Sequence, residues 1–297
     1  MPVLDTMMIR IADINTIVVS PDASLLIKAD ASTGRFLVQG LEPHIKIEVR
    51  PADLSVHPVP GKMVFDSGGI WKLYQEDDLY TFRLQSDTLG TVPYKIARVR
   101  KDFEKAEVLI HRAYLKPGQA VYPLEYPLDE VLFIHHLGCL GKGVEVHACG
   151  VVDPQGKGHL FLGQSGAGKT TLARLWENEP GVLVLSDDRI ALRRTDGKLW
   201  MYGTPWHGEA NFSSPARAPL ADVCFLVKGA ENRLLQKGVT ESIGRFIASS
   251  FILFYNREAV DFTMGFLEDV VKAVPCYELS FSPDKRVVKW LQNKYAG

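Results

Sequence analysis

The residues whose types and spacing most clearly suggest chemistry form one short glycine-rich segment. They fit the pattern GxxxxGK[ST] at every fixed position, and they are Gly163, Gln164, Ser165, Gly166, Ala167, Gly168, Lys169 and Thr170. Glycine is required where backbone N–H groups must wrap closely around phosphate oxygens, because a Cβ would obstruct that approach. The segment therefore predicts a phosphate-binding loop of the P-loop type.

The residues on either side of this segment agree with that interpretation. The run HLFLG before it is typical of a buried strand, and KTTLARLWEN after it has helical spacing. The start of such a helix presents unpaired amides and a partial positive charge to phosphates. Lys169 would add a full charge on the β- and γ-phosphates, Thr170 would place its hydroxyl on Mg²⁺, and Thr171 would lie in the same first turn. We expect ATP and Mg²⁺ here; a glycine-rich turn with a chance lysine is the alternative.

A pair of acids follows the next apolar run. VLVLS ends at Asp187 and Asp188, and open α/β sheets bind ligands where strands end. One carboxylate can hold the metal while the other takes a proton from an attacking hydroxyl; a solvated turn is the alternative. The chain reads Asp-Asp-Arg and has no acid pair ending in Glu, no LSGGQ-like stretch and no NKxD-type guanine reader. These features favour transfer to a hydroxyl over hydrolysis.

The combination of VHACGVVD, GQSGAGKTTL and VLSDDRI resembles the catalytic domain of HPr kinase/phosphorylase and, more distantly, phosphoenolpyruvate carboxykinases. The resemblance covers roughly residues 128 to 230 and implies an α/β P-loop kinase domain that phosphorylates a serine hydroxyl with ATP. It implies that Asp187 is the base, that Lys169 assists catalysis, that Asp188 lies near the metal with Thr170, and that His147 lines the site. Without the resemblance, a histidine between apolar residues is more typical of a packed core.

Downstream, this chain departs from the family. Where HPr kinases carry a stretch like LEIRGxGIIDV, this chain has GTPWHGEANFSSPARAPLADV. We expect Glu209 to replace the acidic metal ligand, and Trp206, His207 and Arg217 to contact substrate or transition-state charge; a surface loop stiffened by prolines is the alternative. The N-terminal region also differs from that of the HPr enzymes, so the acceptor stays open: a protein, a peptide or a small hydroxyl compound.

Composition restricts the class of protein and its partners. With 46% hydrophobic and 23% charged residues, the chain is typical of a soluble globular protein. A net charge of -1 provides no global field for a polyanion, so nucleic acid is not an expected partner. No export signal and no window of about 18 apolar residues is present, so we expect a cytoplasmic protein that does not cross a membrane. The four cysteines are far apart and are expected to be reduced.

The pattern of predicted secondary structure changes near residue 122. Residues 1–122 read as short strands separated by turns, which predicts a β-rich domain with an antiparallel sheet or sandwich; these strands include TIVVS, SLLIKA, RFLVQG and IKIEVR. WKLYQEDDLYTFRLQ predicts a hairpin. Residues 123–297 form the expected catalytic domain, with helices beginning near residues 128, 169, 241, 258 and 284.

The favoured function is an ATP-dependent, Mg²⁺-requiring kinase, a phosphotransferase that acts on a serine-like hydroxyl. A nucleotide-gated binding protein with little turnover is the alternative, in which ATP sets the conformation that recognises a partner. Carboxykinase-like decarboxylation would need cations to hold a diacid, and the sequence offers Arg189, Arg193, Arg194 and Arg233. The P-loop pattern does not distinguish ATP from other phosphoryl donors. HPr kinases form hexamers, but no surface for such contacts can be identified from the sequence pattern, so a homo-oligomer stays one open possibility here.

Overall fold

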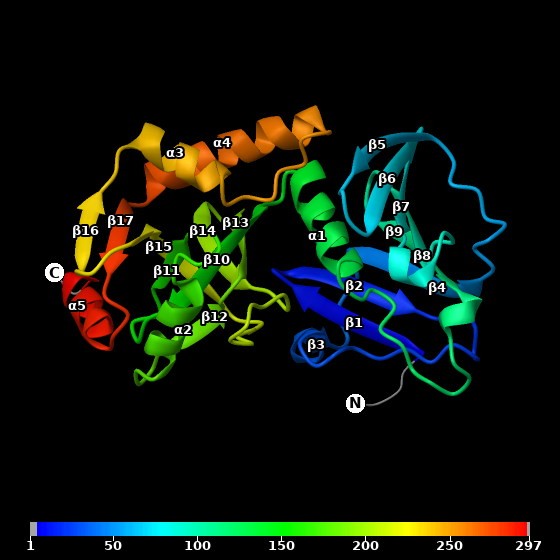
Figure 1. Ribbon diagram of the computed structural model, residues 1–297, viewed down its shortest axis with the longest axis horizontal. Coiled ribbons are helices and arrows are strands. Elements are labelled where there is room, and N and C mark those ends of the chain that lie inside the picture. Colours follow the sequence, from blue (N-terminus) through cyan, green and yellow to red (C-terminus); the bar gives the residue numbers. More distant parts are fainter. Residues whose placement is uncertain (1–4, 296–297) are drawn as a thin grey trace. The chain divides into compact units, whose positions relative to one another are not determined.

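The computed structural model describes residues 5–295, and the chain divides into two compact units, Met1–Val131 and Leu132–Gly297. Each unit is built on one large sheet, and helices are few (Figure 1). The sequence-based boundary lies earlier, between residues 122 and 123. Residues beyond it group with the first unit because Glu125 lies 4.0 Å from Lys95 and Asp129 accepts a hydrogen bond of 3.2 Å from Tyr122.

The first unit contains one nine-stranded sheet across the described residues, in the order β3-β1-β2-β4-β9-β8-β7-β6-β5. The prediction of an antiparallel sheet is wrong in one respect, since β4 is parallel to both of its neighbours, β2 and β9. The strands are β1 (Thr6–Ile11), β2 (Ile14–Val19), β3 (Leu37–Val38), β4 (Ile45–Ala52), β5 (Lys62–Asp66), β6 (Trp71–Glu76), β7 (Leu79–Leu84), β8 (Lys95–Arg100) and β9 (Lys105–His111).

Alternation of side chains explains why these segments form strands. In β4, Ile45, Ile47 and Val49 are buried whereas Lys46 and Arg50 are exposed, which is the period of a half-buried strand. The predicted hairpin is confirmed as β6 and β7, which pair from Trp71–Leu84 to Glu76–Leu79. The predicted strand SLLIKA is wrong: its one ladder contact is an isolated bridge from Ile27 to Val121.

The second unit carries the segments on which the functional predictions depend. Its sheet has the order β11-β10-β13-β14-β15-β17-β16, and β12 pairs with β10. The elements are α1 (Leu128–Cys139), which begins before the boundary, β10 (Val144–Val152), β11 (Gly158–Leu162), α2 (Lys169–Glu177), β12 (Leu183–Ser186), β13 (Arg189–Thr195), β14 (Lys198–Gly203), β15 (Arg217–Lys228), β16 (Arg233–Gln236), α3 (Val239–Ile247), α4 (Arg257–Ala273), β17 (Cys276–Phe281) and α5 (Arg286–Tyr295).

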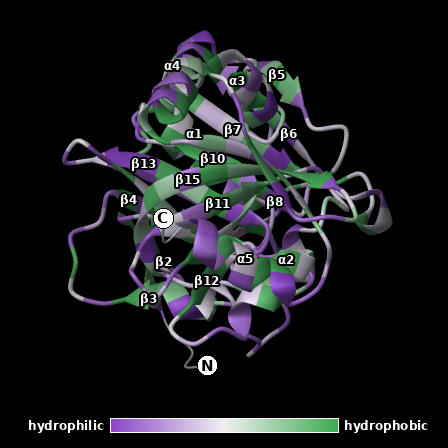
Figure 2. Ribbon diagram, turned by 90° about the vertical axis from the view of Figure 1, so that its left-hand side faces the viewer, coloured by the Kyte–Doolittle hydropathy of each residue, from purple (hydrophilic) through white to green (hydrophobic). Residues whose placement is uncertain are grey.

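Helices cover both faces of this sheet. One apolar cluster joins Phe246 of α3 and Leu267 of α4 to the sheet, and another joins Trp176 of α2 and Val288 of α5 to its opposite face. Figures 1 and 2 show α3 and α4 on one side of β10 and β15, with α2 and α5 on the other. Because both faces are covered, the central strands are apolar throughout, and all five residues of β11 are buried.

One predicted helix is too long. The sequence predicts a helix over residues 241–256, but α3 ends at Ile247. The chain leaves the helix because its next residues bind β10: His147 donates its N–H to the Ser249 carbonyl at 2.7 Å, and Ser250 forms a bridge with Val146. The helices beginning near residues 128, 169, 258 and 284 are confirmed.

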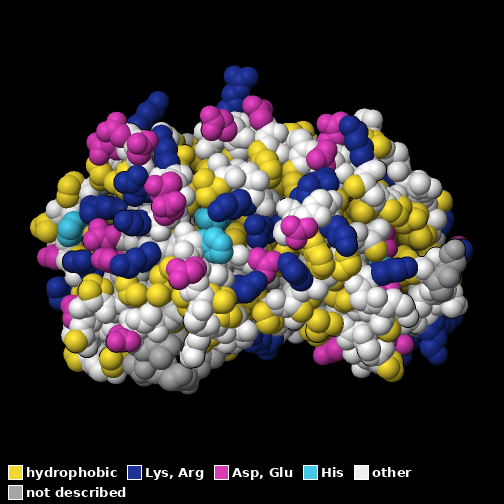
Figure 3. Space-filling view, turned by 180° about the vertical axis from the view of Figure 1, so that it is seen from behind, with side chains coloured by type: hydrophobic (Ala, Val, Ile, Leu, Met, Phe, Trp, Pro, Cys, Tyr) yellow, Lys and Arg dark blue, Asp and Glu magenta, His cyan; other side chains and the backbone are white. Residues whose placement is uncertain are grey.

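The surface mixes charges of both signs. On the face drawn in Figure 3, basic and acidic side chains are interspersed, in keeping with 34 basic and 35 acidic residues in the chain. Among the described residues, no helix combines the length and apolar character that a membrane crossing requires.

Candidate active site

The glycine-rich loop, residues 163–168, joins the end of β11 to the start of α2. The predicted strand before it and helix after it are therefore confirmed. β11 pairs in parallel with β15, and β15 pairs in parallel with β17. The loop consequently lies at the carboxyl ends of adjacent parallel strands, which is where open α/β sheets place ligands. Gln164, Ser165 and Gly166 are exposed there.

Gly168 is required by both backbone and packing. Its φ of +105° is rarely adopted by residues with side chains, and a Cβ there would lie 2.9 Å from Cζ of Phe281. It is also the N-cap of α2, with no side-chain capping bond and no acid in the first turn. The first amides of α2 are thus left without a competing carboxylate from the helix itself, which suits a helix start that receives an anion.

Lys169 is buried and folds back over the loop. Its Nζ donates to the carbonyl oxygens of Gly163 at 2.7 Å and Gln164 at 3.4 Å. Burial lowers the pKa of Lys169 from its ordinary value, and it outweighs the opposing effect of the Asp188 carboxylate. A desolvated ammonium held at the loop binds an anion more strongly than a hydrated one would.

Asp187 is almost fully buried and fixes the segment that contains Glu209. Its Oδ1 accepts the N–H of Gly208 at 3.0 Å, and its Oδ2 accepts the N–H of Ala210 at 3.1 Å. Oδ2 also accepts a longer hydrogen bond of 3.5 Å from the Thr170 hydroxyl. The approach is close, because a Cβ on Gly208 would lie 2.7 Å from Oδ2. Asp187 thus joins the start of α2 to the loop around residue 209.

Asp188 points to different partners. Nε2 of His147 lies 2.8 Å from its Oδ1, and the Arg189 guanidinium binds its Oδ2. Burial disfavours the charged carboxylate, but the His147 hydrogen bond and the Arg189 charge outweigh it, so the pKa of Asp188 is lowered. The Arg189 guanidinium is itself held 4.6 Å from the centroid of the Phe251 ring.

These contacts differ from the arrangement that the family resemblance implies. The resemblance puts Asp188 near Thr170, whereas the structure puts Asp187 there and groups Asp188 with His147. The two acids form the connection between β12 and β13, both of which pair with β10. Consecutive residues at such a connection point in different directions, so only one of the two carboxylates reaches α2.

Of the remaining predicted residues, Glu209 is exposed, whereas Trp206, His207 and Arg217 contact other groups of the protein. Glu209 lies between the two residues whose N–H groups bind Asp187. Trp206 is buried against Phe133, with ring centroids 5.2 Å apart, so it packs in the interior. Arg217, the first residue of β15, has its guanidinium 4.5 Å from the centroid of the Trp200 ring and donates to the Tyr202 hydroxyl at 3.1 Å. Both partners are in β14, so the side chain is held against that strand. His207 bonds the neighbouring carbonyl of Gly208 at 2.9 Å.

The residues present fit a magnesium nucleotide in part. The loop offers an uncapped helix start and a buried ammonium, and Gly166 at φ +77° has open space where a Cβ would project. The predicted metal set of Thr170, Asp188 and Glu209 is not a preformed cluster: among residues 5–295, no group of three or more His, Cys, Asp or Glu side chains is placed to hold a metal ion.

Sequence reasoning missed two residues that hold the acid pair. Ser186 is completely buried, and its hydroxyl accepts the N–H groups of Asp188 at 3.2 Å and Arg189 at 3.1 Å while donating to the Trp206 carbonyl. Arg189, one of the cations that the sequence offers for a diacid, instead neutralises Asp188. The serine directly before the acids was the available signal, because serine often bonds backbone amides within tight turns.

Comparison with known proteins adds little to this geometry. No protein-family model and no curated protein matched the chain. A solved structure described as the Hpr(Ser) kinase/phosphatase from Coxiella burnetii matches over 52% of this chain and 99% of that chain, at 14% identity and a TM-score of 0.30. A TM-score this low does not establish a common fold, so the relation to the HPr kinases stays a prediction.

Proposed function

We propose that the protein is a Mg²⁺-dependent phosphotransferase that uses ATP and phosphorylates a hydroxyl acceptor. The observation that carries the proposal is the convergence of three features at one site. The glycine-rich loop ends in the buried Lys169, the Thr170 hydroxyl meets Asp187, and a second carboxylate, Asp188, is paired with His147. Phosphoryl transfer needs a loop that binds the phosphates, ligands for the metal ion and a base that accepts the proton of the acceptor hydroxyl.

The contacts support a particular division of labour. Asp187 and Thr170 would hold Mg²⁺, which neutralises charge on the phosphates when it is bound. Asp187 accepts three hydrogen bonds and is almost fully buried, so its carboxylate is held in place and suits an anchor for the metal. Lys169 would bind the transferring group, and the first amides of α2 would hold the remaining phosphate oxygens.

The proton of the acceptor hydroxyl would pass to the pair formed by His147 and Asp188. His147 is half-buried, with 30% of its side chain exposed, so an acceptor can approach it. With its Nε2–H donated to Asp188, its Nδ1 can take the proton, and the ionised Asp188 stabilises the imidazolium that results. The His147 hydrogen bond and the Arg189 charge together lower the pKa of Asp188, which keeps it ionised for this role. The acceptor belongs to the class of serine-like hydroxyls on a protein, a peptide or a small molecule.

The test is to incubate the protein with Mg²⁺ and ATP labelled at the γ-phosphate, with serine and threonine peptides and with small polyols. Label should move to an acceptor in the wild type and should not do so in His147→Asn. If ATP binds but no label reaches any acceptor or water, the protein is a nucleotide-gated binding protein, and the kinase proposal is wrong.

A further inference from the structure

A carboxylate that the proposed reaction does not use is buried beside the candidate active site. Glu145 lies on β10, and its side chain has no surface exposed to solvent. Its neighbours in the strand, Val144 and Val146, are buried as well. Burying a carboxylate is unfavourable, and replacing a buried ion pair by apolar side chains is often neutral or stabilising. Stability alone therefore does not account for an acid at this position.

The pairing of β10 with β13 places Glu145 on the same face of the sheet as His147 and Arg189. His147 follows Glu145 by two residues, and alternate residues of a strand point to the same face. Across the ladder, His147 lies opposite Arg189, whereas Glu145 lies opposite Ala191. Glu145 and Arg189 are therefore diagonal neighbours on one face, an arrangement in which long side chains reach each other.

Four polar side chains in contact lead from the interior to the surface at this point. Oε1 of Glu145 lies 3.9 Å from Nε of Arg189, and the other side of the same guanidinium binds Asp188. Asp188 in turn lies 2.8 Å from Nε2 of His147. The exposed fraction of the side chains rises along this series, being 0% for Glu145, 16% for Arg189, 26% for Asp188 and 30% for His147. Glu145 can therefore affect a substrate only through its neighbours.

The Arg189 guanidinium is held at its flat face as well as at its edges. The centroid of the Phe251 ring lies 4.6 Å from it, which is a cation–π distance. The N–H of Phe251 donates to the Glu145 carbonyl at 3.0 Å, so the ring is fixed to the strand that carries the acid. An arginine side chain has many rotamers, and ordering its planar group needs contacts from several directions. Glu145 and Phe251 together determine where the guanidinium meets Asp188.

We propose that Glu145 is a positioning residue for phosphoryl transfer, and that it holds Arg189 against Asp188, the carboxylate that orients the base. The inference rests on the phosphotransferase function proposed above. A base takes a proton efficiently only when it is oriented toward the acceptor hydroxyl. Without the Glu145 charge, the guanidinium can leave Asp188, and the imidazole of His147 loses its fixed partner. Nucleotide binding uses Lys169 and the start of α2, so it does not depend on Glu145.

The first experiment measures label transfer from γ-labelled ATP to the peptides and polyols of the assay above. Glu145→Gln keeps the shape of the side chain and removes its charge. It should lower kcat by about tenfold or more and leave KM for ATP unchanged, because the orientation of the base is lost while the glycine-rich loop is intact. Phe251→Leu leaves every charge in place and should lower kcat in the same way, which keeps the test open if Glu145→Gln does not fold.

A double variant separates positioning from a general loss of structure. Once Asp188→Asn has removed the carboxylate that Arg189 binds, the position of the guanidinium no longer matters to the base. Glu145→Gln should therefore lower kcat no further in an Asp188→Asn background. A merely structural role would lower kcat by the same factor in both backgrounds, and that result would overturn the proposal.

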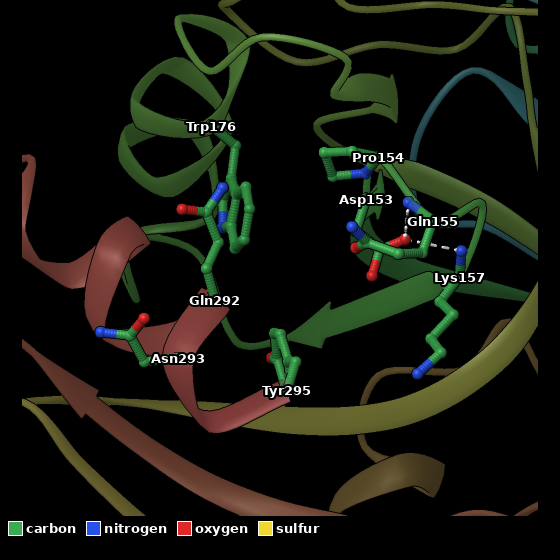
Figure 4. Close-up of a pocket in the computed structure, with 8 residues that line it drawn as sticks. All are labelled: Asp153, Pro154, Gln155, Lys157, Trp176, Gln292, Asn293 and Tyr295. Atoms are coloured by element: carbon green, nitrogen blue, oxygen red, sulfur yellow. Dashed lines mark hydrogen bonds between the residues drawn. The ribbon is translucent and has the colours of Figure 1, made fainter. Parts of the chain in front are cut away.

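Asp222→Asn is the matched control, because it also removes a buried carboxylate that contacts a histidine in the second unit. Asp222 lies 2.6 Å from Nδ1 of His159, whose Nε2 lies 3.3 Å from Asp153. Figure 4 shows Asp153 in the turn before β11, whereas the glycine-rich loop follows that strand. Asp222→Asn should lower stability and leave kcat of the folded protein unchanged. A loss of kcat equal to that of Glu145→Gln would overturn the proposal, because any buried acid would then have this effect.

A measurement without turnover distinguishes failure of this inference from failure of the proposed function. The Nε–H signal of Arg189 in proton–nitrogen NMR spectra can be assigned from its loss in Arg189→Lys. It should shift in Glu145→Gln and stay in place in Asp222→Asn. An unshifted signal in Glu145→Gln overturns the inference even where the wild type transfers phosphate. A shifted signal in a protein whose wild type transfers no label overturns the proposed function, and the role of Glu145 in the reaction with it.

Discussion

At the residue scale, the site depends on two adjacent aspartates with different surroundings. Asp187 is fixed by two backbone N–H groups and the Thr170 hydroxyl, whereas Asp188 is fixed by His147 and Arg189. Carboxylates that differ in this way are suited to different tasks, because the environment decides which one holds an ion and which one assists a proton transfer.

Substituting each aspartate by asparagine tests this division. Asp188→Asn should keep ATP affinity and lower the rate of phosphoryl transfer by about 10²-fold or more, because the His147 imidazolium loses its counter-charge. Asp187→Asn should weaken Mg²⁺-dependent ATP binding and lower the free energy of unfolding by about 1–3 kcal/mol, because an amide cannot accept all three hydrogen bonds. Rapid-quench kinetics measures the rate of transfer, and calorimetry measures ATP binding and the free energy of unfolding.

The opposite pattern would restore the assignment that the family resemblance implies. In that case Asp187→Asn would bind Mg-ATP normally and lose transfer, while Asp188→Asn would lose the metal. The two variants are matched controls, since they change adjacent residues in the same way.

At the scale of elements, the glycine-rich loop and α2 depend on one position whose backbone conformation requires glycine. Gly168→Ala should lower the free energy of unfolding by about 1–3 kcal/mol, because alanine is disfavoured at φ +105° and its Cβ would meet Phe281. It should also reduce ATP binding, since the start of α2 would shift. Chemical denaturation and ATP titration measure both.

Gly244→Ala is the matched control for that substitution. Gly244 lies within α3 with open space around a Cβ and no positive φ, so alanine should leave stability unchanged or raise it by about 0.5–1 kcal/mol. Equal effects of the two substitutions would show that neither the positive φ nor the contact with Phe281 requires glycine at position 168.

The buried cluster of His159 with Asp222 and Asp153 makes a pH-dependent contribution to stability. Burial would lower the pKa of His159, but Asp222 and Asp153 outweigh it and raise the pKa above its ordinary 6.5. The paired charge therefore stabilises the fold fully below pH 6.5, and this contribution is lost as pH rises through the raised value. The neighbouring Cys224 and Tyr295 stay neutral throughout, because burial raises their pKa values well above the ordinary ones.

His159→Gln removes this dependence. The free energy of unfolding of the wild type should fall as pH rises above 6.5, whereas that of the variant should lack this slope. The variant should also be less stable by about 3–5 kcal/mol at low pH, because two buried carboxylates lose their partner. Urea denaturation from pH 6 to 9 measures both, and parallel curves for the two proteins would contradict the account.

At the scale of the whole molecule, all the proposed phosphotransferase residues lie in the second unit. They fall between His147 and Ala210, while the second unit runs from Leu132 to Gly297. A piece covering residues 123–297, which keeps α1 whole, should therefore unfold cooperatively and bind Mg-ATP with the affinity of the full chain. Calorimetry on both proteins checks this, and loss of binding in the shorter piece would show that the first unit contributes to the site.

Local patterns account for what the sequence predicted. GxxxxGK[ST] with its strand and helix is a local signal, and apolar periodicity located α1, α2, α4 and α5. The parallel pairing of β4 with β2 and β9 joins distant segments, and alternation along a strand does not specify its partners. The end of α3 depends on contacts with β10 in the same way.

The candidate site, too, could be predicted from the sequence only where local patterns define it. Its residue types were evident, but which aspartate meets Thr170 depends on the bend between β12 and β13, and no pattern in the letters DD encodes that direction. The His159 cluster joins residues 6 and 63 positions apart in the chain, so it left no motif to recognise.

The most direct test of the central claim is a titration of the protein with ATP in the presence and absence of Mg²⁺. Binding should be saturable, should strengthen with Mg²⁺, should be lost in Lys169→Ala, and should be unchanged in Lys198→Gln, which removes an exposed cation elsewhere. Binding that ignores both Mg²⁺ and Lys169, or no binding of ATP at all, would contradict it.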